Sequence, residues 1–280
     1  NLVLGLCTWE CDMAYRTLRS WLRHLAETDR LMLAESGVDL DFEVAAVAKR
    51  QDGSKAVLFP SPKRGGANAP SVPVIANLLA QRSWVAEALG VGPGEVLSAF
   101  RQAVDAPIKS EEISNAPVQE AIIRDPDLLR DLPVPLHNEH DSGPYISAGL
   151  VIARNPRTGV QNVSINRLQI SAKDRMGILM LPRHLHNFYQ AAENQGDVLE
   201  VAVAIGVDPA TLLASQAIVP IDFDELEIAG ALHGHPLRVV KCVSNEVRVP
   251  ADAEVVIEGR LLPKVRESEG PFAEFPQYYG

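Results

Sequence analysis

Two groups of side chains between residues 162 and 274 have types that could carry out chemistry together. The first group, called here the donor triad, offers an amide, an imidazole and a carboxylate from Asn162, His184 and Glu225. Such nitrogen and oxygen donors suit Mn²⁺ or Mg²⁺ better than a metal that prefers thiolates. Three protein ligands would leave coordination positions open for a cofactor phosphate. Residue chemistry alone leaves the choice of acidic ligand open among Glu225, Asp222, Asp224 and Glu227.

The second group, called here the Arg-Glu-Glu cluster, consists of Arg167, Glu269 and Glu274, which could handle protons beside an anionic substrate. The Gly270–Pro271 pair between the glutamates predicts a turn, so the two carboxylates can converge. Desolvation and a neighbouring carboxylate both raise the pKa of a carboxyl group, which lets one glutamate remain protonated as a general acid. The arginine would keep its neighbour ionised and could bind a substrate carboxylate. A solvated acidic turn is the plainer interpretation, since Glu267 lies close by.

Two further clusters have the composition of metal sites, but the sequence favours simpler interpretations. His137 and His140 lie in a loop bounded by Pro and Gly, with no helix to bring ligands together, so this loop is predicted to pack near the site. Cys7 and Cys11 could share a helix face, but without a second ligand pair we expect two small apolar residues. With Cys242 the cysteines number three, an odd count that favours a reducing cytoplasm over a disulfide framework.

The elements that must position these groups are predominantly strands. Gln161 to Ile170 is one candidate strand, in which Asn162 and Arg167 would face opposite sides unless a bulge intervenes. Helices are predicted over residues 185–195 and 209–216. The other candidate strands are residues 118–123, 145–153, 178–181, 198–205, 237–242, 247–249 and 254–259.

The first 110 residues have a more helical pattern. Apolar residues recur at helical spacing from Tyr15 to Ala34, and further helices are predicted over residues 42–50, 74–89 and 94–104. Ala56–Phe59 is a predicted strand, residues 64–74 a loop and residues 107–114 a connector. We therefore place a domain boundary near residue 110.

The composition excludes some classes of protein. The chain of 280 residues has 46% hydrophobic and 22% charged residues, as in ordinary soluble globular proteins. Its formal net charge of −10 argues against nucleic-acid binding, because neutralising phosphates requires concentrated Lys and Arg. No apolar stretch approaches the ~20 residues of a membrane-spanning helix. Asn1–Cys7 lacks the basic start of a secretory signal, so neither nucleic acid nor membrane is an expected partner.

The combined pattern resembles the UbiD family of reversible decarboxylases, which use prenylated flavin mononucleotide (FMN). The donor triad matches the family's metal ligands, and the Arg-Glu-Glu cluster matches its catalytic set. Gly143–Gly149 is similar to the family's strand that enters the flavin domain, and Val249–Gly259 is also similar. The likeness extends from about Leu18 to the last residue.

This resemblance implies an α+β fold and a bound cofactor. A helix-rich mixed α/β domain (residues 1–110) would precede a split β-barrel domain (residues 111–280) that binds prenylated FMN. The donor triad would hold Mn²⁺ or Mg²⁺ against the cofactor phosphate, with K⁺ alongside. The flavin contacts implied are Asn162, Ser164, Ile165, Asn166, Arg167, Arg183, His184, Ser215, Gln216 and Glu225.

The resemblance also implies the reaction, a reversible non-oxidative decarboxylation of an aromatic, heteroaromatic or α,β-unsaturated carboxylic acid. Glu274 would be the general acid, while Arg167 and Glu269 orient the substrate. A flavin prenyltransferase would supply the cofactor. Residues near the substrate pocket would be Met180, Arg183 and Phe275.

Members of the family are usually far longer than this chain. The resemblance therefore implies that the chain is a fragment without the usual C-terminal domain, and that the full-length protein is a homo-oligomer. The resemblance implies no role for the N-terminal extension, Asn1 to about Arg16, which is predicted to be a packing helix.

Three other functions remain open. A flavin-binding redox or cofactor-carrying module would bind plain FMN and would be indifferent to mutation of Glu274. A metal-dependent hydrolase built on His137 and His140 would lose its metal in a His137→Ala variant but not in a His184→Ala variant. A non-catalytic fragment or assembly domain is favoured only by the missing C-terminal part.

Overall fold

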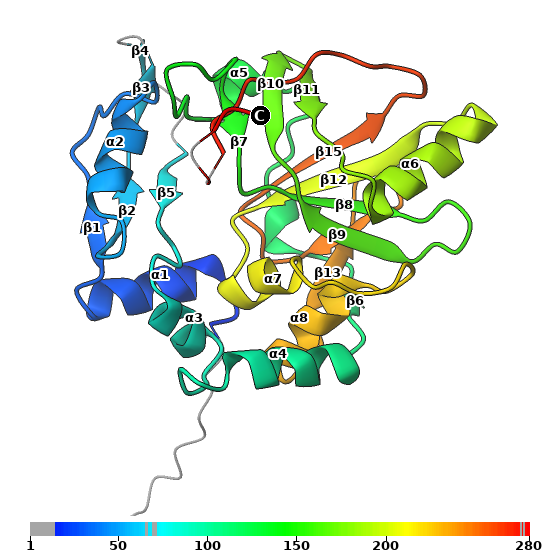
Figure 1. Ribbon diagram of the computed structural model, residues 1–280, viewed down its shortest axis with the longest axis horizontal. Coiled ribbons are helices and arrows are strands. Elements are labelled where there is room, and N and C mark those ends of the chain that lie inside the picture. Colours follow the sequence, from blue (N-terminus) through cyan, green and yellow to red (C-terminus); the bar gives the residue numbers. More distant parts are fainter. Residues whose placement is uncertain (1–14, 65–66, 69–71, 275, 277) are drawn as a thin grey trace, which may run out of the picture.

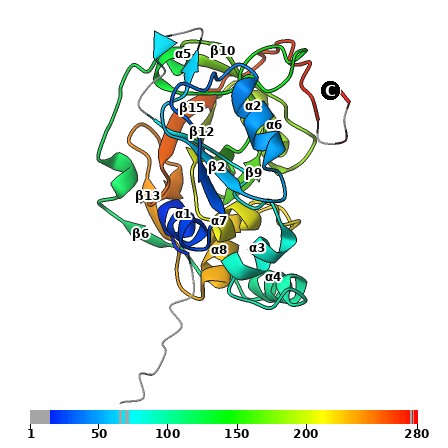
Figure 2. The ribbon, with the colours of Figure 1, turned by 90° about the vertical axis from the view of Figure 1, so that its left-hand side faces the viewer.

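The structure of the chain is a computed structural model that describes residues 15–64, 67–68, 72–274, 276 and 278–280. Its first part is a three-stranded sheet flanked by helices (Figures 1 and 2). β1 (Leu31–Leu33) pairs in parallel with β2 (Ala56–Phe59), which pairs antiparallel with β5 (Val74–Ala76). The other elements of this part are α1 (Leu18–Glu27), α2 (Glu43–Arg50), β3 (Lys63–Arg64), β4 (Ala67–Asn68), α3 (Arg82–Ala88) and α4 (Val96–Asp105).

Two of the helices predicted in this part are wrong over half of their length. The helical pattern from Tyr15 ends at Glu27, and the chain turns at Asp29 (φ +55°) to enter β1. Val74–Ala76 is a strand because its backbone pairs with β2, which overrides a helical apolar spacing. The predicted helices at α2 and α4 and the predicted strand at β2 are confirmed.

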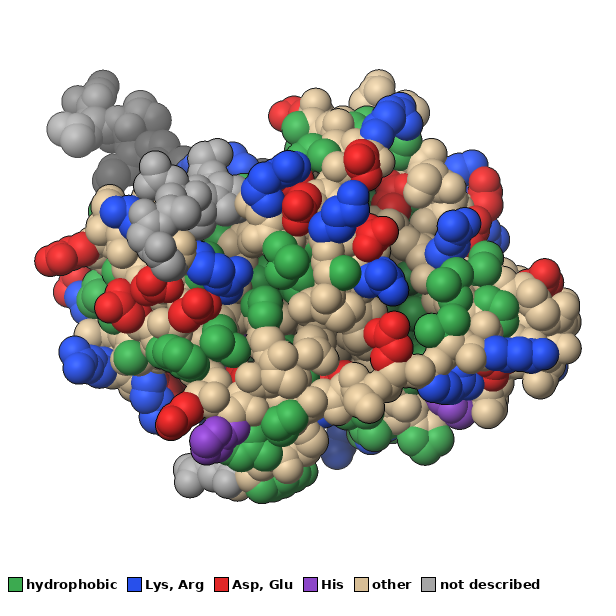
Figure 3. All heavy atoms as spheres, turned by 90° about the horizontal axis from the view of Figure 1, so that it is seen from above, with side chains coloured by type: hydrophobic (Ala, Val, Ile, Leu, Met, Phe, Trp, Pro, Cys, Tyr) green, Lys and Arg blue, Asp and Glu red, His purple; other side chains and the backbone are tan. Residues whose placement is uncertain are grey.

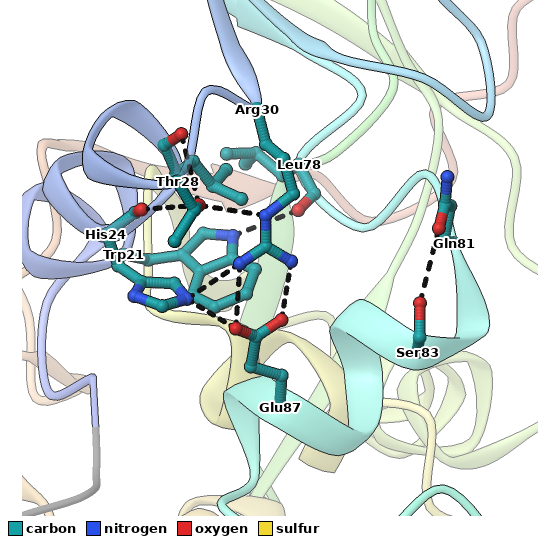
Figure 4. Close-up of polar contacts among 9 residues, drawn as sticks. Trp21, His24, Thr28, Arg30, Leu78, Gln81, Ser83 and Glu87 are labelled. Atoms are coloured by element: carbon teal, nitrogen blue, oxygen red, sulfur yellow. Dashed lines mark hydrogen bonds and ion pairs between the residues drawn. The ribbon is translucent and has the colours of Figure 1, made fainter.

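A cluster of polar and aromatic side chains ties α1 to α3 (Figure 4). The Glu87 carboxylate accepts hydrogen bonds from Arg30 Nη1 at 2.5 Å and Nη2 at 2.7 Å, and lies 2.6 Å from His24 Nε2. Beside it, the buried Trp21 donates its indole N–H to the Leu78 carbonyl at 2.9 Å. The cluster therefore links helices that lie more than fifty residues apart in the sequence by directed bonds.

Glu87 predicts a pH dependence of stability. The hydrogen bonds from Arg30 lower its pKa to about 2, against the effect of burial and with a further contribution from His24. A depressed folded-state pKa stabilises the fold above the unfolded pKa, and this contribution is lost as the pH falls toward 2. We expect Glu87→Gln to cost about 1 kcal/mol at pH 7, since solvent screens a carboxylate that is one-third exposed.

Thermal unfolding of both proteins between pH 7 and 2 measures this effect. The gap in melting temperature should be about 2 °C at pH 7, should narrow as the pH falls below about 4.5, and should close near pH 2. Glu254→Gln is the control, because its partner Arg19 is 79% exposed and exposed ion pairs contribute little. A gap that stays constant over the pH range would contradict the assignment.

The second part of the chain is organised around a four-stranded antiparallel sheet with the order β15-β12-β8-β9 (Figure 1). β8 (Leu150–Arg154) and β12 (Leu199–Ile205) are central, and β9 (Gln161–Ile165) and β15 (Val255–Leu261) lie at the edges. Successive residues of the central strands enter two different hydrophobic clusters, because side chains alternate across a sheet. One cluster includes α6 (His184–Gln195), and the other includes α7 (Pro209–Ala214) and α8 (Glu225–His233).

Two smaller sheets complete this part. β10 (Leu168–Ala172) lies between β11 (Arg175–Ile178) and β7 (Tyr145–Ile146). β13 (Arg238–Lys241) lies between β14 (Arg248–Pro250) and β6 (Glu111–Ile113). Short helical turns are η1 (Pro117–Gln119) and α5 (Leu128–Asp131).

The predicted strands of this part are partly confirmed. β12, β13, β14 and β15 occur where they were predicted, as do α6 and α7. Residues 118–123 are not a strand, the predicted connector 107–114 contains β6, and β11 begins and ends earlier than predicted. The helix α8 was not predicted at all.

Two predicted strands are each broken into two. Residues 145–153 divide at Gly149, where a Cβ atom would lie 2.7 Å from Val203 Cγ1, so the backbone approaches β12 closely. Residues 161–170 divide at Asn166 and Arg167 into β9 and β10, which belong to different sheets. The predicted placement of Asn162 and Arg167 on opposite faces of one strand is therefore wrong.

The architecture as a whole is mixed α/β. Within the described ranges, the strands form five separate sheets and none closes on itself, so the predicted split barrel is not confirmed. None of the described helices is long and apolar enough to cross a membrane. On the face drawn in Figure 3, acidic and basic side chains lie side by side.

Candidate functional site

The donor triad gathers at the edge strand β9. Asn162 lies on β9, while His184 and Glu225 are the first residues of α6 and α8. His184 Nδ1 lies 3.1 Å from Asn162 Oδ1, and Glu225 Oε2 accepts a hydrogen bond from the backbone N–H of Val163 at 2.7 Å. The fold thus brings an imidazole, an amide oxygen and a carboxylate from three elements to one place.

Glu225 is a buried carboxylate, with only 3% of the residue exposed. Burial raises its pKa to about 8, although the hydrogen bond from Val163 N–H acts in the opposite direction. Among the described residues it has no ion-pair partner. Buried carboxylates are usually paired with a cation or a metal, because desolvation costs several kcal/mol per ion. The burial and the donor types therefore fit a divalent cation.

The neighbouring carboxylates have other partners. Asp222 accepts hydrogen bonds from Asn155 Nδ2 at 2.6 Å and Thr158 Oγ1 at 2.7 Å. The bonds from Thr158 and Asn155 lower the pKa of Asp222. Asp224 caps α8 by accepting from Leu226 N–H at 3.0 Å, and burial raises its pKa to about 6. By contrast, the Glu225 carboxylate is hydrogen-bonded to β9, through the Val163 N–H.

No group of three or more His, Cys, Asp or Glu side chains in the described part of the chain is arranged to hold a metal ion. The donor triad contains only two such side chains and an amide. A metal there would need further ligands from outside the described residues, such as a cofactor phosphate.

The side chains of the Arg-Glu-Glu cluster also meet, at Arg167 in the break between β9 and β10. Arg167 makes two parallel bonds to Glu269, from Nε to Oε1 at 3.0 Å and from Nη2 to Oε2 at 2.7 Å. Its Nη1 donates to Glu274 Oε1. The guanidinium also lies 5.2 Å from the ring centre of Phe272. The predicted turn at Gly270–Pro271 thus brings both carboxylates to one arginine.

The two glutamates of the cluster differ in how exposed their side chains are. The side chains of Arg167 and Glu269 are 10% and 11% exposed, whereas that of Glu274 is 32% exposed. Burial by itself lowers the pKa of Arg167, but the hydrogen bonds and charge of Glu269, together with the charge of Glu274, raise it overall. Arg167 is therefore a permanent cation that holds Glu269 with both oxygens and Glu274 with one.

The loop that contains His137 and His140 packs beside this cluster, as predicted. Asp141 Oδ1 accepts a hydrogen bond from Ala273 N–H at 2.8 Å, and the rings of His140 and Tyr279 lie 5.5 Å apart. The C-terminal segment also packs against β7, where the rings of Phe272 and Tyr145 lie 4.5 Å apart.

Sequence reasoning missed Tyr145. Its ring lies 4.5 Å from that of Phe272, and its hydroxyl lies 3.0 Å from Ser142 Oγ. Burial raises the pKa of Tyr145, the bond with Ser142 opposes this, and the Glu269 charge adds to the rise. The only signal in the sequence was Tyr145 itself, inside an apolar strand pattern, and its contact with residues over a hundred positions away was not visible there.

The remaining predicted flavin contacts lie around β9 and α7. Ile165 ends β9, Ser164 Oγ donates to Asn166 Oδ1 at 2.9 Å, and Arg183 is exposed directly before α6. Ser215 is buried after α7, and the exposed Gln216 donates to its hydroxyl at 3.2 Å. None of the hydrogen bonds of the described residues joins Ser215 or Gln216 to the donor triad. Outside the described residues lie Cys7, Cys11, Phe275 and most of the predicted N-terminal helix.

Comparison with known proteins gives consistent results. Residues 22–104 match the model of the 3-octaprenyl-4-hydroxybenzoate carboxy-lyase N-terminal domain, and residues 109–280 match that of the Rift-related domain of the same enzyme, UbiD. The chain is 35% identical over 262 residues to the anhydromevalonate phosphate decarboxylase of Methanothermobacter thermautotrophicus. That alignment covers 94% of this chain and 59% of the relative.

Solved structures agree with the family models. An evolved dimeric form of the UbiD-class enzyme HmfF from Pelotomaculum thermopropionicum, in complex with prenylated FMN, is 48% identical with a TM-score of 0.91. The vanillic acid decarboxylase of Sedimentibacter hydroxybenzoicus in closed form is 29% identical with a TM-score of 0.88. The similarity covers 95% of this chain in both cases, but 62% and 59% of those chains.

The chain thus spans about three fifths of the length of these relatives. Within that span, both domain models match in order along the sequence, and the fold closely matches that of HmfF. These matches agree with the convergence of the donor triad and the Arg-Glu-Glu cluster, and the chain belongs to the UbiD family.

Proposed function

We propose that this protein catalyses the reversible non-oxidative decarboxylation of an aromatic, heteroaromatic or α,β-unsaturated carboxylic acid with prenylated FMN. The family membership supports the reaction, and the complex of HmfF with prenylated FMN supports the cofactor. The names of two relatives, a vanillic acid decarboxylase and 3,4-dihydroxybenzoic acid decarboxylases, support a conjugated acid as substrate.

The observation that carries this proposal is the unequal engagement of the two glutamates by Arg167. The side chain of Glu269 is only 11% exposed and uses both oxygens on the guanidinium, so it is fixed and unsuited to deliver a proton. Glu274 is three times more exposed and uses Oε1 on Arg167. Its other oxygen can therefore carry a proton toward a substrate, and we assign Glu274 as the general acid.

The residues of the Arg-Glu-Glu cluster have different roles in the proposed reaction. Arg167, oriented by Glu269 and the face of Phe272, attracts the substrate carboxylate and holds it in place. When bound, prenylated FMN supplies the electron sink for the electron pair left by departing CO₂. Glu274 then delivers a proton from its carboxyl oxygen to the carbon that has lost CO₂, and in the carboxylation direction it removes that proton.

The donor triad would hold the metal and, through it, the cofactor phosphate. A divalent cation such as Mn²⁺ would neutralise the buried Glu225 and accept the Asn162 oxygen and a His184 nitrogen. Flavin contacts at Ser164–Arg167, Arg183, Ser215 and Gln216, and a K⁺ ion beside the metal, are inferred from the family resemblance.

We further infer a two-domain organisation with a boundary near residue 110. The second domain, residues 111–280, would be a split β-barrel. The separate matches to residues 22–104 and 109–280 support the boundary. The dimeric form of HmfF supports a homo-oligomer, and the cofactor would come from a flavin prenyltransferase.

The test is the identity of the flavin retained by the chain. We expect protein co-expressed with a flavin prenyltransferase to retain prenylated FMN, and Mn²⁺ to increase the retained amount. The absorbance spectrum and the intact mass of the released cofactor, with and without Mn²⁺, measure this. Retention of plain FMN, or retention independent of metal, would instead favour a redox module.

A further inference from the structure

Both catalytic glutamates lie on a segment that no helix or strand fixes. Residues 265–272 have no regular secondary structure, and Ala273 makes only an isolated bridge to Tyr279. Within the segment, Phe272 and Gly280 exchange backbone bonds of 3.1 and 3.0 Å, and Glu274 N–H donates to the Tyr278 carbonyl at 2.8 Å. These bonds shape residues 269–274, called here the glutamate turn, but do not attach it to the body of the protein.

Arg167 holds the side chains of Glu269 and Glu274, while the backbone of the turn is attached by His137–Ser142, called here the clamp loop. Asp141 Oδ1 accepts the hydrogen bond from Ala273 N–H at 2.8 Å, and Ser142 N–H donates to the Pro271 carbonyl at 2.9 Å. Ala273 directly precedes Glu274, and Pro271 is two residues after Glu269. The two bonds therefore hold the glutamate turn near each of its catalytic residues.

Asp141 is itself held from the other side. Its Oδ2 accepts hydrogen bonds from the backbone N–H of Asn138 at 3.0 Å and from Asn138 Nδ2 at 3.3 Å. Its own N–H donates to the Asn138 carbonyl at 3.1 Å. Three N–H groups thus converge on the two carboxylate oxygens. In asparagine an NH₂ group, which cannot accept, replaces one of these two oxygens, so the side chain could accept at the position facing Ala273 or at the position facing Asn138 but not at both.

The clamp loop is connected to the core sheet. The Ser142 hydroxyl lies 3.0 Å from the hydroxyl of Tyr145, a residue of β7 that is 1% exposed. Gln169 on β10, two residues after Arg167, donates to the Ser142 carbonyl at 3.1 Å. A continuous set of bonds therefore runs from the strand beside Arg167, through the clamp loop, to the glutamate turn.

We propose that Asp141 is a positioning residue, which holds the glutamate turn at the distance from Arg167 that proton delivery by Glu274 requires. The proposal rests on the proposed function for its catalytic consequence, but not for the attachment itself. Asp141 acts through Ala273 and touches neither substrate nor cofactor. Misplacing a reacting group by about 1 Å can cost on the order of 10²-fold in rate.

The experiment compares Asp141→Asn and Asp141→Ala with wild-type protein, each loaded with prenylated FMN and Mn²⁺. We expect kcat to fall about 10²-fold in both variants, with KM and cofactor retention changed less than about threefold. A merely structural role would lower the melting temperature and cofactor retention together. If the alanine variant fails to fold, the nearly isosteric Asp141→Asn variant still allows kcat, KM and cofactor retention to be measured.

The second readout does not depend on activity. Hydrogen exchange followed by mass spectrometry should show faster exchange in peptides that cover residues 268–280 of the Asp141 variants, with unchanged exchange in β8 and β12. Glu258→Gln is the matched control, because Glu258 likewise accepts N–H bonds with both oxygens, from Val243 at 2.7 Å and Ser244 at 2.6 Å. It should leave exchange in residues 268–280 and kcat unchanged.

The two readouts separate the two proposals. Unchanged hydrogen exchange in residues 268–280 of both Asp141 variants would show that Asp141 does not attach the glutamate turn, whether or not the wild-type protein is active. Faster exchange with unchanged kcat overturns the positioning role. A wild-type protein that binds prenylated FMN but decarboxylates no aromatic or unsaturated acid overturns the proposed function, while the exchange data still decide the attachment.

Discussion

Glu274→Gln is expected to reduce decarboxylation at least about 10³-fold while the protein still retains its flavin, because general acid catalysis contributes 10²–10⁴-fold. Glutamine keeps the size of the side chain and can still accept a hydrogen bond from Arg167, but it cannot donate a carboxyl proton. Glu274 belongs to the Arg-Glu-Glu cluster and not to the donor triad, so cofactor retention should be unaffected. Substrate turnover and the flavin absorbance spectrum of the purified variant measure the two effects.

The control for this variant is Glu267→Gln. Glu267 is an exposed carboxylate two residues before Glu269, so it tests whether any loss of negative charge near the glutamate turn impairs the enzyme. We expect normal turnover in Glu267→Gln. Normal turnover in Glu274→Gln would remove Glu274 from the reaction and return the chain to the class of flavin-binding redox modules.

His184→Ala is expected to have the second large effect, a loss of Mn²⁺ affinity of at least about 10–100-fold, which is the range for losing even an outer partner of a metal ligand. His184 supplies the only nitrogen donor of the triad, and its Nδ1 lies 3.1 Å from Asn162 Oδ1. If the metal links the protein to the cofactor phosphate, flavin retention should fall with it. Metal content by mass spectrometry and flavin content by absorbance, measured on the same sample, test both parts.

His137→Ala is the matched control for metal binding. His137 lies in the clamp loop, its Nδ1 has no hydrogen-bond partner among the described residues, and burial lowers its pKa. A neutral, partly buried imidazole of this kind could also bind a metal, so the comparison discriminates between two sites. Loss of metal in His137→Ala but not in His184→Ala would support a hydrolase built on His137 and His140 and would exclude the donor triad.

The residue types and their order already determined which functional groups this chain contains. The Gly270–Pro271 pair predicts a turn from local backbone preferences, and the structure shows that turn with both flanking glutamates on Arg167. The helix α6 and the strand β12 follow from apolar spacing within one segment. Such features depend on a few consecutive residues, and for that reason the sequence alone could predict them.

Tertiary contacts decided the remaining features. Ile165 and Leu168 belong to one apolar pattern, yet the chain breaks between them because β9 pairs with β8 while β10 pairs with β7 and β11. The strand β5 replaced a predicted helix because β2 offered it a backbone partner. Pairings of this kind depend on residues far away in the sequence, which local periodicity does not record.

In the candidate site, too, some features follow from the sequence and others from tertiary contacts. The sequence supplied the donor triad as one possible set, but four carboxylates between Asp222 and Glu227 were chemically equivalent candidates. Residue chemistry does not distinguish them, but the fold does, because α8 begins at Glu225 and turns that carboxylate onto the Val163 N–H while Asp222 and Asp224 bond elsewhere. The bond between Asp141 and Ala273 spans 132 residues. The sequence by itself therefore determined which functional groups are present, and the tertiary structure decided which of them meet, since contact depends on chain path and burial and not on spacing.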